Sequence, residues 1–60
     1  MTKKEWRRHK YQILIQAGFT PTEASALRDR GKDLIKFLVG LKEEDDEPTV
    51  NRVLKVLGVR

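Results

Sequence analysis

The side chains that could carry covalent or acid–base catalysis are few in this sequence. It contains one histidine (His9), one serine (Ser25), one tyrosine (Tyr11) and no cysteine. Such catalysis needs a nucleophile, a base and an orienting group brought together. His9 instead lies in a run of basic residues, where a solvated position is more natural than a catalytic one. We therefore predict a protein that is not an enzyme.

Carboxylates could bind a metal, and five of the nine acidic residues are contiguous at 43–47. A calcium loop needs its oxygens at alternate positions around a central glycine, whereas no glycine follows this run before Gly58. The absence of cysteine excludes thiolate metal sites. We therefore expect no metal and no cofactor, and predict an acidic loop at about residues 42–47. A site for a cation or a basic partner is the alternative for this loop.

Basic side chains are the main feature that could bind a partner. Outside residues 43–47 the chain carries thirteen lysines and arginines against four acids, a net charge of +9. This balance favours nucleic acid or an acidic protein surface as partner. The candidate binding residues are Lys3, Lys4, Arg7, Arg8, Lys10, Arg28, Arg30 and Lys32. Arg52, Lys55 and Arg60 form a further basic group, and the sequence leaves open whether the groups share one surface.

Helical periodicity places many of these bases on one face of a first helix, beginning at Lys3. At 100° per residue, Lys4, Arg8 and Tyr11 share one stripe, beside a second stripe of Lys3, Arg7 and Lys10. This face could rest on phosphates or on an acidic protein, and an ordinary solvated face is the alternative. The apolar stripe of the same helix begins at Trp6. We expect the Trp6 side chain to lie in the core; the alternative is that it contacts a binding partner.

Capping signals define the first two helices that would position these residues. Thr2 and Thr20 are each followed three residues later by glutamate, which is the pattern of a capping box. The first helix is therefore expected over residues 3–17, with Gly18 ending it. The second is expected over residues 21–30, with Phe19 packing on its first turn.

Two further helices are expected in the second half of the chain. One begins at Lys32 and Asp33 and forms the core helix, because apolar side chains crowd one side of it. These are Leu34, Ile35, Phe37, Leu38 and Leu41. The last helix opens at Pro48, capped by Asp46 or Glu47, and ends at Gly58.

These elements predict an all-α fold, a compact bundle of three to four short helices with a helix-turn-helix-like corner at Gly18–Pro21. Residues 1–60 are expected to form a single domain. No apolar run approaches the roughly 20 residues that span a bilayer, and none follows the basic start as in a secretory signal. We therefore expect a cytoplasmic protein, without a membrane span.

The segment from Leu14 to Arg28, an apolar helix end followed by Ala-Gly-Phe, Thr, Glu-Ala and Leu-Arg, resembles short uncharacterised helical proteins of tailed phages. The resemblance covers about a quarter of the chain. It implies a phage origin, and hence a location in the host cytoplasm or the virion, but no particular activity.

The same segment is similar to ubiquitin-associated-type three-helix domains, through Gly18-Phe19 and Ala26-Leu27. That likeness implies a compact helical geometry, and we do not extend it to ubiquitin binding. Compared with a DNA-binding helix-turn-helix, the second helix would expose Thr22, Glu23, Ser25 and Ala26, which are poor readers of base edges. Backbone binding by the first helix stays compatible with this pattern.

The sequence therefore predicts a non-catalytic interaction protein that binds an acidic macromolecule through its basic first helix, with nucleic acid favoured over protein. The alternative is a structural or assembly component of a virion or another complex, docking on a protein neighbour. The oligomeric state is left open.

Overall fold

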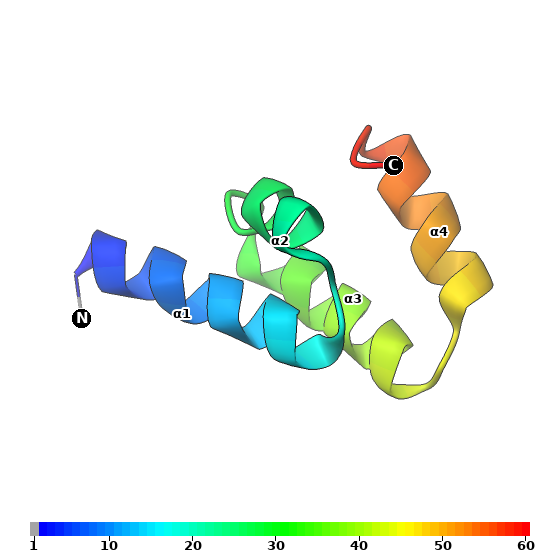
Figure 1. Cartoon of the computed structure of the whole chain (residues 1–60), viewed down its shortest axis with the longest axis horizontal. Coiled ribbons are helices and arrows are strands. Elements are labelled where there is room, and N and C mark those ends of the chain that lie inside the picture. The colour runs from blue at the N-terminus through cyan, green and yellow to red at the C-terminus, as the bar shows by residue number, and fades with distance from the viewer. Residues whose placement is uncertain (1) are drawn as a thin grey trace.

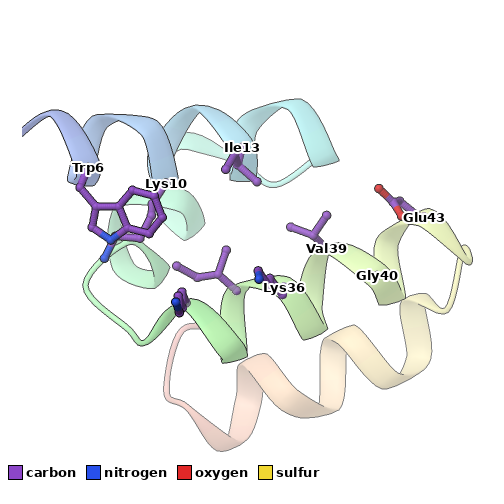
Figure 2. Close-up of a pocket in the computed structure, with 9 residues that line it drawn as sticks. Trp6, Lys10, Ile13, Lys36, Val39, Gly40 and Glu43 are labelled. Carbon is purple, nitrogen blue, oxygen red and sulfur yellow. The ribbon is translucent and has the colours of Figure 1, made fainter. Parts of the chain in front are cut away.

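The computed structural model describes residues 2–60 as four helices (Figure 1). They are α1 (Lys3–Ala17), α2 (Pro21–Leu27), α3 (Lys32–Glu43) and α4 (Glu47–Val56). Helix α1 packs against α2 and α3, and α4 packs against α3. Figure 2 shows α1 and α4 on opposite sides of α3, which is therefore the central element. No strand occurs in residues 2–60, and the predicted all-α bundle is confirmed.

Both predicted capping boxes are present. The Thr2 hydroxyl accepts a hydrogen bond from the Glu5 backbone amide at 3.2 Å, and the Glu5 carboxylate accepts one from the Thr2 amide at 3.3 Å. Thr20 and Glu23 make the same pair of bonds at the start of α2, each 3.2 Å long. Gly18, at φ 109°, ends α1 in the left-handed conformation that glycine adopts most easily.

Helix α2 is shorter than predicted, because it ends at Leu27 rather than at Arg30. The Arg30 amide donates to the Leu27 carbonyl at 2.9 Å, a bond across a tight turn. Gly31 then serves as the N-cap of α3. These turn residues reverse the chain so that α3 can pack against α1, and this tertiary requirement overrides the helix propensity of residues 28–30.

The predicted acidic loop is also shorter in the structure. Helix α3 continues to Glu43, α4 begins at Glu47, and only residues 44–46 connect them. Asp45 adopts a positive φ of 56°, a region that aspartate tolerates better than most residues. The Asp46 carboxylate accepts a hydrogen bond from the Thr49 amide at 3.4 Å, which confirms Asp46 as the cap of α4. The acidic run therefore mainly ends one helix and starts the next.

The core draws side chains from all four helices and from the α1–α2 connection. Its buried members are Leu14, Phe19, Ala24, Leu27, Ile35, Leu38, Leu41, Val50 and Leu54. The prediction that Phe37 belongs to this core is wrong, because 53% of its surface is exposed. Helix α3 buries the stripe formed by Ile35, Leu38 and Leu41. Phe37 directly precedes Leu38, and neighbouring residues of a helix point about 100° apart, so the Phe37 side chain lies off this stripe.

An ion pair joins the first half of the chain to its C-terminal residue. Glu23 is only 7% exposed, and its carboxylate accepts a hydrogen bond from the Arg60 Nε. The Arg60 Nη1 also donates to the Asn51 Oδ1 at 2.6 Å. The sequence comparison placed Glu23 among the exposed residues of α2, and this prediction is wrong. The pairing of Glu23 with Arg60 joins positions 37 apart in sequence, so local patterns could not reveal it.

This ion pair predicts a loss of stability in acid. The hydrogen bond from Arg60 holds the pKa of the Glu23 carboxyl below its usual 4.5, although burial acts in the opposite direction. A depressed pKa in the folded state stabilises the fold above the unfolded pKa, and this contribution disappears as the pH falls through the folded value. We expect the urea midpoint of the parent to fall below about pH 4.5 more steeply than that of Glu23→Gln. Parallel profiles for the two proteins would contradict a role of this pair.

Candidate functional site

A basic cleft lies on α1 beside the end of α2. It is lined by Lys4, Arg7, Arg8 and Tyr11 of α1 and by Arg28, which directly follows α2, and its volume is about 270 Å³. Figure 1 shows the N-terminal turns of α1 extending past α2, and residues 3–9 in these turns are exposed. Four of the eight predicted binding residues therefore come together in one site.

Helical spacing and the α1–α2 corner together build this cleft. Lys4, Arg8 and Tyr11 follow one another at intervals of four and three, so their side chains lie on one stripe of α1. The corner at residues 18–20 folds α2 back against α1 and brings Arg28 to that stripe. The guanidinium carbon of Arg28 lies 5.9 Å from the centre of the Tyr11 ring, within range of a cation–π interaction.

Arg28 is less exposed than the other cations of the cleft. Its Nε atom is buried and has no hydrogen-bond partner in the described residues 2–60. Because Nε is buried, an anion in the cleft would meet the terminal Nη atoms of this guanidinium. Tyr11 adds a phenol group that can donate one further hydrogen bond.

Positive charge dominates the cleft. No carboxylate is among its lining residues in the described part of the chain. Arg7 pairs with Asp29 at 3.0 Å, but the two side chains are 53% and 60% exposed. An ion pair of this kind contributes little and is easily exchanged for another anion. The charged side chains that line the cleft are therefore all hydrogen-bond donors, which suits a phosphate or carboxylate ligand.

The other four predicted binding residues lie elsewhere. Lys10 and Lys32 line a separate groove between α1 and α3, together with Trp6. The Arg30 guanidinium donates to the Leu57 carbonyl at 3.4 Å and so caps the end of α4. Lys3 is exposed at the start of α1, outside the cleft lining.

Tyr11 is a cleft residue that sequence reasoning did not count among the binding candidates. Its signal was available, because it continues the stripe of Lys4 and Arg8 by one turn. Trp6 differs from expectation in another way: it is 38% exposed rather than buried in the core. Its ring stacks at a tilt of 31° against His9, with 5.6 Å between ring centres.

The comparison with a DNA-binding helix-turn-helix finds little support in the geometry. Helix α2 has only seven residues, and Glu23, one of the four that would face a groove, is buried. Its remaining exposed side chains include Thr22 and Ser25, which discriminate poorly between base pairs. Reading of a base sequence by α2 is therefore disfavoured.

Residues 2–60 contain no cluster of three or more histidine, cysteine, aspartate or glutamate side chains that could hold a metal ion. Over the same residues, no helix has the length and apolar character required to cross a membrane. Comparison of the chain with known protein families, with characterised proteins and with solved structures finds no match.

Proposed function

We propose that this protein is a non-catalytic binding module that contacts the sugar–phosphate backbone of nucleic acid through the basic cleft. One observation carries the proposal. The basic cleft is lined by four cationic side chains, Lys4, Arg7, Arg8 and Arg28, and by no carboxylate of residues 2–60. Three of these four cations are arginines, whose planar fork of donors matches the geometry of a phosphate group.

The proposed contacts are with phosphate groups and not with the edges of bases. Phosphate contacts position a protein on nucleic acid, whereas contacts with base edges provide specificity. Because α2 offers few side chains that could read bases, the proposed binding is independent of base sequence. As part of the same proposal, we place the protein in the cytoplasm, with a phage genome as its source.

The salt dependence of binding tests this proposal. A fluorescein-labelled DNA duplex is titrated with the protein, and binding is followed by anisotropy at several salt concentrations. Four phosphate contacts predict a slope of log K against log salt of about −3.6, or roughly a 100-fold loss of affinity between 50 and 200 mM salt. A labelled duplex of different sequence serves as control and should bind equally.

The same titration separates the proposal from an assembly role. A component that docks on a protein neighbour through apolar contacts has no reason to bind DNA, and its association with that neighbour changes little with salt. Undetectable DNA binding at 50 mM salt, or a slope near zero, would therefore contradict the proposal. A strong preference for one duplex would contradict its sequence-independent form.

A further inference from the structure

A second surface feature is an apolar groove between α1 and α3. Trp6, Lys10 and Ile13 come from α1, and Lys36, Val39, Gly40 and Glu43 from α3, with the side chains directed into the space between the helices (Figure 2). Lys32 and Ile35 complete the lining. Helix α4 lies on the other side of α3 and does not cover the groove.

The size and chemistry of the groove suit the side chains of a peptide. Its volume is about 190 Å³, whereas pockets for small molecules measure roughly 300–1,000 Å³. An apolar cavity of about 150 Å³ holds a benzene-sized group. The groove therefore has room for one phenylalanine or leucine side chain over Ile13, Ile35 and Val39.

Gly40 is a residue that the fold itself does not require. It lies within α3 without a positive φ, and a Cβ atom added to it would meet nothing within 4 Å. Glycine within a helix is less stable than alanine. What its missing side chain does provide is close access to the α3 backbone from the groove, as a docked segment would need.

Charge along the groove indicates what kind of segment would dock. Lys10, Lys32 and Lys36 line it, and Glu43 lies at the end opposite Trp6. The Nζ of Lys10 is 5.9 Å from the Trp6 ring centre, so this cation lies directly beside the apolar floor. A partner with carboxylates next to its apolar side chains would be attracted at the lysine end and repelled at the Glu43 end, which defines its direction.

A second copy of this chain does not supply such a segment. Its acids are concentrated at residues 43–47, where the flanking apolar residues Leu41 and Val50 are buried. Its exposed large apolar side chains, within residues 2–60, are Trp6, Phe37 and Val56. Acids do not outnumber bases within four residues of any of them, so the lysines of the groove would not favour these segments.

We propose that the groove between α1 and α3 binds an acidic amphipathic helix of another protein, with an apolar side chain over Ile35 and carboxylates against Lys32 and Lys36. Two helices that flank an apolar floor accept a third helix in the manner of other helix-in-groove interfaces. This interaction lies outside the basic cleft and does not depend on nucleic-acid binding.

Selection from a displayed library of amphipathic helices, randomised at the polar positions and free of tryptophan, tests the proposal. We expect the selected peptides to carry more acidic than basic residues beside their apolar anchors, relative to the starting library. Their binding is then measured through the fluorescence of Trp6, the single tryptophan of the chain. A selection that yields no binder, or no excess of acids, would overturn the proposal.

Substitution of Gly40 separates docking from folding. Gly40→Ala should raise the thermal midpoint by roughly 2–8 °C, because alanine is the better helix former. Gly40→Leu fills the groove and should weaken the selected peptide at least tenfold while the chain remains folded. Unchanged peptide affinity in Gly40→Leu would show that the peptide binds elsewhere and would overturn the proposal.

Charge reversal tests the lysine end of the groove. Lys32→Glu/Lys36→Glu should weaken the peptide about tenfold or more, and an acid at position 32 suits the start of α3. Arg52→Glu/Lys55→Glu, with the same change of net charge on α4, serves as the matched control and should leave affinity within about twofold. If both double variants lost the same amount of peptide affinity, the effect would come only from the net positive charge of the protein, and this result would contradict the proposal.

Two further measurements distinguish other occupants of the groove. Sedimentation would reveal a dimer that Trp6→Ala dissociates, and this result would assign the groove to a second copy. Displacement of the peptide by a DNA duplex would assign it to nucleic acid. Either result overturns the proposal.

The basic-cleft variant Lys4→Glu/Arg8→Glu should leave peptide affinity unchanged. Failure of the proposed nucleic-acid function and failure of this inference can therefore be distinguished.

Discussion

Leu38→Ala is expected to unfold most of the protein at room temperature. Leu38 is fully buried in the middle of α3, where the core residues of the other helices surround it. Truncation of a buried leucine costs about 2–5 kcal/mol, from lost burial and from the cavity that remains. A core of this size rarely supplies more than about 3–5 kcal/mol, so the loss approaches the whole free energy of unfolding.

The neighbouring residue provides a matched control for this experiment. Phe37 is larger than Leu38 but 53% exposed, so Phe37→Ala should change the free energy of unfolding by only about 0.5 kcal/mol. Urea denaturation followed by circular dichroism measures both variants. If Leu38→Ala were as stable as the parent, or if Phe37→Ala were the more damaging change, the described packing of α3 would be wrong.

Lys4→Glu/Arg8→Glu should give the largest loss of nucleic-acid binding. The two side chains lie one turn apart on α1 and both line the basic cleft. Loss of two phosphate contacts should weaken binding roughly 10–100-fold at 0.1 M salt and reduce the salt slope by about two units. Anisotropy titration with the labelled DNA duplex, at several salt concentrations, measures both quantities.

The fold should survive this double substitution. Lysine, arginine and glutamate are all good helix formers, and glutamate near the start of α1 complements the helix dipole. Arg52→Glu/Lys55→Glu is the control, because neither residue lines the cleft, so the variant removes no contact there and changes only an attraction that salt screens. Equal losses in the two double variants would rule out the cleft as the contact surface.

The helix boundaries that depend on local chemistry could be predicted from the sequence. Thr2 and Thr20 with their glutamates, Gly18 and Gly58 give signals that are complete within a few residues, and the structure confirms each of them. The end of α2 was not predictable in this way. It depends on where the chain must turn so that α3 reaches α1, which is a property of the packed bundle.

The choice of core residues was only partly predictable. Helix α3 has apolar residues at more positions than one face can bury, so periodicity alone could not exclude Phe37. The flanking helices decide which stripe is covered. For the binding residues, the sequence supplied the stripe of Lys4 and Arg8, but the meeting of that stripe with Arg28 required the α1–α2 crossing.

The ion pair between Glu23 and Arg60 also bears on the order in which the chain folds. The main helix contacts join elements that are one or two steps apart along the chain, so they close short loops at a small cost in entropy. Proteins dominated by local contacts fold in microseconds to milliseconds. The ion pair spans 37 positions, the widest separation among the side-chain hydrogen bonds of residues 2–60. It should therefore form after the helices have assembled, and its removal should speed unfolding more than it slows folding.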